Sequence, residues 1–303
     1  MRSQIVGSSL RSNDDREILK PSPLVTVVIP VRNRENLIER AMISVGEQTI
    51  GDWECLVVDD HSTDRTSSVV ADLVACDDRF RLIQHESPAG AQAARNTGIR
   101  MARGDWVAFL DSDDRWLPSS LTSRLGIAAM TDVAVVHSDA YISVPSGERA
   151  RLGVPPLRGS CYEELLRRPG PVFPALLVKR LVLEDIGPLD EALVSYQEWD
   201  TYIRIAQRTA FGFVDEPTFE YSLGNADQIS ADKRKVATGY EQVVTKHRTE
   251  ILERLGPAQL ALHYKVASKL HWQARDPLGF FRCLSRFTAY GLRARRVRAQ
   301  GAS

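Results

Sequence analysis

The fold is decided by the stretch Gly104-Asp-Trp-Val-Ala-Phe-Leu-Asp-Ser-Asp-Asp-Arg-Trp-Leu-Pro118. Its apolar run from Trp106 to Leu110 has the length of a buried strand and leads directly into three carboxylates, Asp111, Asp113 and Asp114. Like charges repel one another in a poorly hydrated crevice, and a divalent cation removes that repulsion. Oxygen ligands suit Mg²⁺ or Mn²⁺, which share their coordination shell with substrate phosphates. The cluster therefore predicts a metal site for a phosphate-bearing ligand; the alternative is that the aspartates only cap the next helix.

Two similar units precede this stretch. Leu24 to Val31 is a β-branched run typical of a buried strand, and Trp53 to Val58 is a second strand that ends in the polar cluster 59–64. Helical periodicity follows each of them. The remaining elements expected in this half are strands at 80–84 and 133–137 and helices at 89–102 and 121–130. Strands that alternate with helices predict an α/β fold with a mostly parallel sheet, whose ligands bind beyond the carboxyl ends of the strands.

Composition excludes several classes of function. The 303 residues are 43% hydrophobic, which suffices for a sizeable core, and the formal net charge is zero, so we expect no nucleic-acid partner. The longest apolar runs are too short to cross a bilayer. The four cysteines lie far apart without paired ligand spacing, which favours reduced thiols and a cytoplasmic location.

The chain divides into three segments. Residues 1–22 are polar and predict a flexible leader. Residues 23–230 form the main domain, with a ligand-binding half at 23–138 and a less regular, proline-rich half at 139–230. The pattern of residues 231–303 predicts a helical extension, with helices at 240–255, 258–274 and 278–297. The last helix interleaves arginines with aromatic residues, so it is suited either to an anionic membrane surface or to packing on the domain.

Several motifs stand in a fixed order in the first half of the chain. They are Val27-Val-Ile-Pro-Val-Arg-Asn-Arg-Glu35, Gln48-Thr49, Val57-Val-Asp-Asp-His-Ser-Thr-Asp64, Gly90 with Ala94-Arg-Asn-Thr-Gly98, and Phe109-Leu-Asp-Ser-Asp-Asp114. Through them the segment from Val25 to Pro118 resembles the family-2 inverting glycosyltransferases. A second block, Ile186-Gly-Pro-Leu-Asp-Glu191 followed by Gln197-Glu-Trp-Asp200, is similar to the acceptor-side motif of that family. The resemblance implies the GT-A fold, a Rossmann-like sheet flanked by helices, followed here by the C-terminal helical extension.

The resemblance also implies roles for individual residues. Asp113 would be the direct ligand of Mg²⁺ or Mn²⁺, Asp111 would contact the ribose or the metal shell, and Glu198 would be the general base. The residues that would bind the nucleotide-sugar donor are Pro30, Arg32, Glu35, Asp60, Arg95, Asp111 and Ser112. Two positions depart from the family pattern: Arg32 replaces the usual aromatic residue, and Glu198 replaces the commoner Asp. The C-terminal histidine of some members has no counterpart among Gly224, Asn225 and Asp227.

The implied activity is metal-dependent, inverting transfer from a nucleotide sugar, with UDP-sugars favoured, to a hydroxyl of a glycan or lipid-linked acceptor. The implied location is the cytoplasm, with peripheral contact at the inner face of the membrane left open. One alternative is a catalytically silent sugar-nucleotide-binding scaffold of polysaccharide assembly. Another is that Glu198 merely stabilises a helix N-terminus, where a carboxylate is favourable. A nucleotidyltransferase is disfavoured, because Arg32-Asn-Arg-Glu35 is not a glycine-rich, lysine-bearing phosphate loop.

Overall fold

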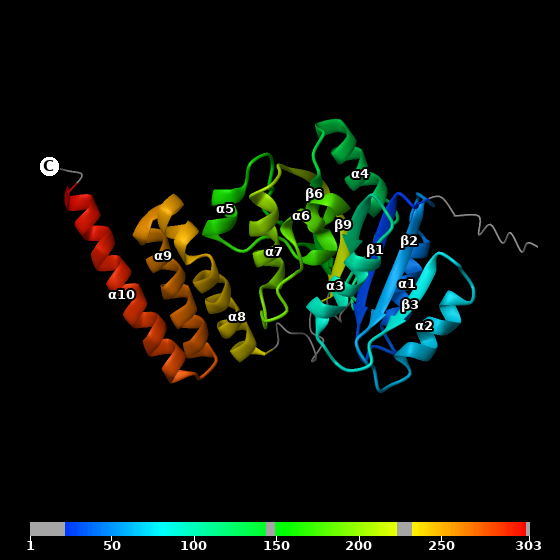
Figure 1. Ribbon diagram of the computed structural model, residues 1–303, viewed down its shortest axis with the longest axis horizontal. Coiled ribbons are helices and arrows are strands. Elements are labelled where there is room, and N and C mark those ends of the chain that lie inside the picture. The colour runs from blue at the N-terminus through cyan, green and yellow to red at the C-terminus, as the bar shows by residue number, and fades with distance from the viewer. Residues whose placement is uncertain (1–21, 144–148, 223–231, 301–303) are drawn as a thin grey trace, which may run out of the picture.

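Within residues 22–143, 149–222 and 232–300, which this computed structural model describes, nine strands form one curled sheet (Figure 1). Their order is β3-β2-β1-β4-β8-β6-β9-β5, and β7 also pairs with β6. The strands span Val25–Val31 (β1), Trp53–Asp59 (β2), Phe80–Gln84 (β3), Trp106–Phe109 (β4), Arg115–Trp116 (β5), Val135–Ser143 (β6), Arg149–Arg151 (β7), Leu177–Lys179 (β8) and Phe211–Ser222 (β9). Apart from Ser22, the predicted leader lies outside the described residues, as do Gly224, Asn225 and Asp227.

The first half of the sheet is parallel, as the sequence predicts. β1 lies between β2 and β4, β2 pairs with β3, and all of these pairings are parallel. Every residue of β1 and β2 is buried, which explains why their sequences are mostly apolar and do not alternate regularly between apolar and polar residues. Because these strands run in one direction, the residues that follow β1, β2 and β4 meet at one edge of the sheet.

Beyond β4 the sheet becomes mixed. β8 enters between β4 and β6 and runs antiparallel to both. β6 and β9 are parallel to each other, whereas β9 pairs with β5 in the antiparallel sense. The α/β fold class is therefore confirmed, and a purely parallel arrangement holds only for the half in which strands and helices alternate regularly.

The described residues form two large hydrophobic cores, and alternate residues of β1 point into different ones. Val25, Val27 and Ile29 lie in one, here called the first core, and Val28 lies in the other, the second core. The helices over the first core are α1 (Ile38–Gly46), α2 (Thr66–Val74) and α4 (Ser120–Thr131). Over the second lies α3 (Ala91–Met101), in which Gly98 is so close to Val28 that a Cβ atom would collide with that side chain. This glycine therefore permits the close approach of helix and sheet.

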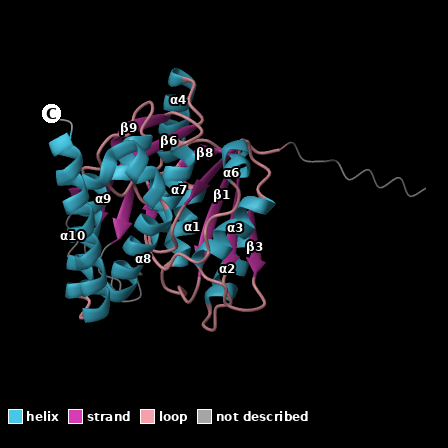
Figure 2. Cartoon of the chain, turned by 60° about the vertical axis from the view of Figure 1, so that its left-hand side comes forward, coloured by secondary structure: helices cyan, strands magenta, loops and turns pink. Residues whose placement is uncertain are grey.

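The remaining helices gather on the side of the second core. They are α5 (Tyr162–Arg167), the 3₁₀ turn η1 (Phe173–Ala175), α6 (Arg180–Ile186), α7 (Gln197–Ala206), α8 (Lys233–Lys246), α9 (Arg248–Gln273) and α10 (Pro277–Gln300). Helices α8, α9 and α10 lie side by side at the end of the molecule farthest from β3 (Figures 1 and 2). Tyr240, Val243 and Tyr264 of this extension share one buried cluster with Val28 of β1 and Trp199 of α7. The extension thus completes the core of the sheet domain.

The structure confirms the helix break that the sequence predicts in the extension and adds a second one. The sequence pattern predicts a break between 255 and 258, and α9 is interrupted there by Gly256, whose φ of 77° is non-helical, and by Pro257. The turn at His247, between α8 and α9, is not predicted. The apolar periodicity continues through the turn at His247, because residues on both sides of it are buried, and so the pattern conceals the turn.

Candidate active site

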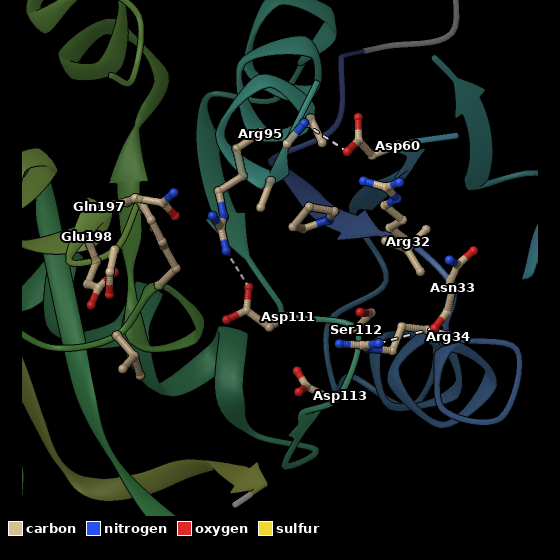
Figure 3. A pocket seen from close by; sticks show the side chains of 18 of the residues that line it. Arg32, Asn33, Arg34, Asp60, Arg95, Asp111, Ser112, Asp113, Gln197 and Glu198 are labelled. Carbon is tan, nitrogen blue, oxygen red and sulfur yellow. Dashed lines mark hydrogen bonds and ion pairs between the residues drawn. The ribbon is translucent and has the colours of Figure 1, made fainter. Parts of the chain in front are cut away.

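The carboxyl ends of β1, β2 and β4 open into a cleft of about 620 Å³ (Figure 3). The start of α3, the start of α7 and the first turn of α8 contribute to its walls. Of the predicted site residues, all except Glu35 line this cleft; they are Pro30, Arg32, Asp60, Arg95, Asp111, Ser112, Asp113 and Glu198. Asp111 lies between Glu198 on one side and Arg32 on the other (Figure 3).

Arg95 of α3 holds Asp111 in place. Its Nη2 atom donates a hydrogen bond of 2.6 Å to Asp111 Oδ1, and its Nη1 atom donates one of 2.8 Å to Gln92 Oε1. The guanidinium carbon lies 4.3 Å from the ring centre of Phe173, which it covers. Arg95 is buried, so this always-charged, planar donor is rigidly held beside the carboxylates.

The three aspartates of the β4–β5 turn have different surroundings. Asp111 and Asp113 line the cleft, whereas Asp114 is fully buried and its Oδ1 atom accepts a hydrogen bond of 2.8 Å from the backbone N–H of Ser222. Asp114 therefore fastens the end of β9 to the acidic turn. Arg40 of α1 donates a hydrogen bond to the backbone oxygen of Asp113, which fixes the other side of the turn.

The electrostatics of this turn suit a divalent cation. Burial raises the pKa of Asp111; the charge of Arg95 opposes that effect, and the charge of Asp113 adds to it. Burial also raises the pKa of Asp114 well above its usual value, and the charges of Asp111 and Asp113 act in the same direction. Negative charge is thus concentrated where a cation would stabilise it. The carboxylate oxygens of Asp111 and Asp113 are ligands that fit Mg²⁺ or Mn²⁺.

Asp60, which follows β2, both lines the cleft and organises the segment before α3. Its carboxylate accepts hydrogen bonds from the backbone N–H groups of Ala89 (2.7 Å) and Gly90 (2.8 Å) and lies 2.9 Å from His85 Nδ1. Burial alone would raise the pKa of Asp60, but these partners outweigh it and hold the pKa below its ordinary value. Asp59 instead stabilises a local turn, because its Oδ1 atom accepts a hydrogen bond of 2.9 Å from the backbone N–H of Ser62.

The segment after β1 forms the side of the cleft opposite α7. Pro30 is buried and Arg32 is exposed, and both line the cleft. Asn33 adopts a left-handed conformation with φ 51°, and its Oδ1 atom accepts a hydrogen bond of 2.8 Å from the backbone N–H of Thr63. This hydrogen bond therefore connects the loop after β1, which contains Arg32, to the loop after β2.

Glu198 enters the cleft from the first turn of α7. Tyr196, just before this helix, has φ 55°, a left-handed conformation that is unusual for a residue other than glycine. Trp199 and Asp200 are buried, whereas Glu198 is partly exposed and lines the cleft. Burial is the largest influence on the Glu198 carboxyl and raises its pKa, against the opposing effects of its own backbone amide and of Arg95.

Asp200 anchors α7 to the extension. Its Oδ1 atom lies 2.8 Å from both His247 Nε2 and Lys246 Nζ. Arg204, one helical turn on, comes within 3.7 Å of Oδ2, as the sequence spacing suggests. Residues at the α8–α9 junction therefore fix the position of α7, the helix that bears Glu198.

The structure does not bring Glu35 to the cleft. Its Oε2 atom accepts a hydrogen bond of 2.9 Å from the backbone N–H of Arg65, just before α2. Conversely, the cleft contains residues to which the sequence patterns assign no role, namely Asn33, Arg34, Phe173, Ser195, Tyr196, Gln197, Tyr221 and Lys235. Tyr196 and Gln197 adjoin Glu198 in sequence, and that proximity is a signal that could have found them. Phe173 and Lys235 reach the cleft only through tertiary packing.

Comparisons with known proteins identify similar sequences and similar folds. The sequence model of glycosyl transferase family 2 matches residues 26–173. The chain is 29% identical over 218 residues to TuaG, a glycosyltransferase assigned to teichuronic acid biosynthesis in Bacillus subtilis, and the match covers 71% of this chain and 84% of TuaG.

Two solved structures share the fold. TarS 1–349 from S. aureus, in complex with UDP-GlcNAc, has a TM-score of 0.67 and 18% identity, covering 88% of this chain and 81% of that structure. The mannosyltransferase PcManGT from Pyrobaculum calidifontis, in complex with GDP-Man and Mn²⁺, has a TM-score of 0.59 and 19% identity. That match covers 89% of this chain and 82% of PcManGT.

Proposed function

Because the chain belongs to glycosyl transferase family 2 and has a GT-A fold, we propose that it is a metal-dependent, inverting glycosyltransferase. It transfers a sugar from a nucleotide-sugar donor, with UDP-sugars favoured, to an acceptor hydroxyl. One observation carries this proposal: a single cleft contains the acidic pair Asp111 and Asp113 between Arg32 on one side and Glu198 on the other.

In this proposal the donor lies along the carboxyl ends of β1, β2 and β4. Pro30 and Arg32 flank the nucleoside, Ser112 lies beside the donor, and Arg95 faces the diphosphate. Asp60 accepts a hydrogen bond from the base; a carboxylate has about four lone-pair sites, and the donors from His85, Ala89 and Gly90 leave room for one more. A base with a ring N–H, such as uracil or guanine, fits this remaining site, and the family resemblance favours uracil and therefore UDP. Two structures of this fold hold UDP-GlcNAc and GDP-Man, which supports a nucleotide-sugar donor.

Asp113, with Asp111 beside it, would hold the divalent cation. When bound, Mg²⁺ or Mn²⁺ would neutralise the charge that develops on the departing nucleoside diphosphate. The Mn²⁺ in PcManGT supports a divalent metal in this fold. The role of Arg95 is to orient Asp111 and to keep a fixed positive charge at the diphosphate position.

Glu198 takes a proton from the attacking hydroxyl of the acceptor. As that oxygen forms its bond to the anomeric carbon, the bond between that carbon and the phosphate oxygen breaks on the opposite face, and its electron pair leaves with the nucleoside diphosphate. One in-line displacement inverts the configuration. A raised pKa makes Glu198 a better base than an ordinary glutamate, because the proton is held more tightly once it has been accepted.

The acceptor is a growing glycan or a lipid-linked sugar of polysaccharide biosynthesis. The assignment of TuaG to teichuronic acid biosynthesis supports this class of acceptor. The half of the chain that contains Phe173, Ser195 and Tyr221 supplies the acceptor side of the cleft.

The experiment that tests this function is the release of UDP from a set of UDP-sugars in the presence of Mn²⁺, with and without glycan acceptors. Glu198→Gln keeps the size of the side chain but removes the base, so turnover should fall roughly 10²- to 10⁴-fold. Binding of UDP, followed by thermal shift, should remain as in the unaltered protein. Glu163→Gln serves as the control, because Glu163 lies on α5 outside the cleft lining and is more than half exposed.

Full turnover in Glu198→Gln would remove the proposed base. Binding of UDP-sugars without turnover by the unaltered protein, under any metal condition, would favour the alternative of a sugar-nucleotide-binding scaffold.

A further inference from the structure

The turn between α9 and α10 exposes a group of large apolar side chains, Trp272, Leu278 and Phe281, which we call the aromatic corner. Trp272 is 69% exposed, Leu278 is 79% exposed and Phe281 is 64% exposed. The half-buried Phe280 connects the two aromatic side chains, since its ring centre lies 5.3 Å from that of Trp272 and 5.1 Å from that of Phe281. The corner therefore combines a continuous group of aromatic rings with the exposed Leu278.

This corner is rigidly built. Asp276 Oδ1 accepts a hydrogen bond of 3.1 Å from the backbone N–H of Gly279, and Asp276 Oδ2 lies 2.8 Å from His271 Nδ1. His271 Nε2 in turn lies 3.0 Å from Glu241 Oε2 of α8. A Cβ atom at Gly279 would collide with His271 and Asp276. The exposure of the apolar side chains is thus imposed by a tightly held turn.

Positive charge surrounds the aromatic corner. Lys233 and Arg275 line a groove of about 700 Å³ whose wall includes Trp272. The exposed cations of this region are Lys233, Arg234, Lys235, Lys269 and Arg275. These cations outnumber the carboxylates at the corner, which are Asp232, an acceptor of hydrogen bonds from the backbone N–H groups of Arg234 and Lys235, and Asp276, which lies beside His271. An apolar tip flanked by cations matches the boundary of a bilayer, where acyl chains lie beneath anionic headgroups.

The corner lies at the same end of the molecule as the mouth of the cleft. Figures 1 and 2, related by a rotation about the vertical axis, both place the α9–α10 turn and the carboxyl end of β1 at the lower end. The first turn of α8 connects the two surfaces, because Lys233 lines the groove beside Trp272 and Lys235 lines the cleft. The same helical turn therefore borders both the corner and the cleft.

The rest of α10 is committed to packing. Cys283 is buried, Phe287 and Tyr290 pack against the second core, and Arg282 and Arg286 pair with Glu241. The helix therefore cannot lie flat on a membrane with its aromatic face inserted while it packs in this way. Among the described residues, no helix is long and apolar enough to cross a bilayer.

We propose that the aromatic corner is a docking site for an anionic phospholipid surface. Trp272, Leu278 and Phe281 enter the interfacial layer, while Lys233 and Arg275 contact lipid phosphates. A second copy of the chain fits less well, because a two-fold interface through this patch would bring the flanking cations of both copies together. The proposal does not depend on the transfer reaction, and its test needs no donor.

The test is sedimentation of the full chain with phosphatidylglycerol vesicles and with phosphatidylcholine vesicles at low salt. The unaltered protein should bind the anionic vesicles more tightly, and added salt should weaken that binding. Trp272→Ser combined with Leu278→Ser and Phe281→Ser should reduce the partition coefficient at least about tenfold. Lys233→Gln combined with Arg275→Asn should reduce it about twenty-five-fold, because each cation near an anionic surface is worth about fivefold.

Matched controls use equally exposed residues elsewhere. Met130→Ser removes an apolar side chain that is 82% exposed on α4, and Arg295→Gln with Arg296→Gln removes two exposed charges from the distal part of α10. Both should bind vesicles as the unaltered protein does. If the serine variant melts early, the charge variant decides the result. Absence of binding to anionic vesicles, equal binding by corner and control variants, or a dimer that the corner variants dissociate would each overturn the proposal.

Discussion

Gly239 of α8 packs against Ser195, which lies two residues before α7 begins at Gln197. A Cβ atom at position 239 would be 2.6 Å from the carbonyl oxygen of Ser195 and 2.7 Å from its backbone nitrogen. Ser195 and Tyr196 line the cleft directly before Glu198. The helical extension therefore sets the position of the segment that presents the proposed base, and it does so through backbone contact that tolerates no larger residue.

Replacement of Gly239 by alanine should disturb both stability and turnover. The added methyl group must displace the Ser195 backbone, and overpacking of this kind costs about 1–3 kcal/mol. We expect a lower melting temperature, and a larger loss in kcat for UDP release than in UDP affinity, because the donor side of the cleft is not displaced.

Gly126→Ala is the matched control for this substitution. Gly126 lies inside α4, and a Cβ atom added there would meet no other atom within 4 Å, so alanine should stabilise the helix by about 0.5–1 kcal/mol. Equal behaviour of the two alanine variants would show that the Gly239–Ser195 contact does not constrain the site.

Asp200→Asn should destabilise the protein by about 2 kcal/mol at neutral pH, since Asp200 receives charge-assisted contacts from Lys246 and His247. Burial alone would raise the pKa of Asp200, but these partners hold it below its usual value. A carboxylate with a lowered pKa in the folded state contributes stability above its unfolded pKa of about 4, and this contribution is lost as the pH falls through the folded value.

Urea denaturation at several pH values measures this effect. The difference in unfolding free energy between the unaltered protein and Asp200→Asn should be constant from neutral pH down to about pH 4 and should shrink below it. A difference that grows in acid would contradict the assigned direction of the pKa shift.

The pH dependence of turnover should report Glu198. The base must be ionised to accept a proton, and burial raises its pKa, so the acidic limb of kcat/KM should have its midpoint above the ordinary glutamate value. In Glu198→Asp, the side chain commoner in this family, the limb should persist with reduced kcat. A limb at the ordinary glutamate pH, unchanged in Glu198→Gln, would assign the titration to another group.

The half of the domain at 23–138 could be predicted in some detail, because the sequence patterns that indicate its strands and helices are local. Buried parallel strands appear as uninterrupted apolar runs, and the carboxylates that end them must meet at one edge of the sheet. Gly98 weakens the prediction of a helix at α3, yet it is required there by its contact with Val28. Asp111, Asp113 and Asp60 are predicted as neighbours for the same topological reason, and the structure brings them into one cleft.

The half of the domain at 139–230 could be predicted only in part, because the positions of its residues depend on tertiary packing. The direction of β8 follows from its pairing with β4 and β6, which no local pattern records. Phe173 reaches the cleft by stacking under Arg95, and Lys235 reaches it because α8 packs against the approach to α7. For Glu35 the sequence predicts a donor-binding role, because the residue stands in a motif that resembles the family. In the structure its carboxylate instead accepts a hydrogen bond from the backbone N–H of Arg65.

The most direct test of the central claim is a calorimetric titration of UDP into the protein with and without Mn²⁺, compared with Asp113→Ala. The control is Asp72→Ala, at an exposed position on α2. We predict that Mn²⁺ tightens UDP binding in the unaltered protein and in the control. In Asp113→Ala this enhancement should be lost, by at least the roughly 10- to 100-fold that removal of a supporting residue costs at metal sites. Equal Mn²⁺-dependent affinity in Asp113→Ala would contradict the assignment of this acidic turn as the metal and diphosphate site.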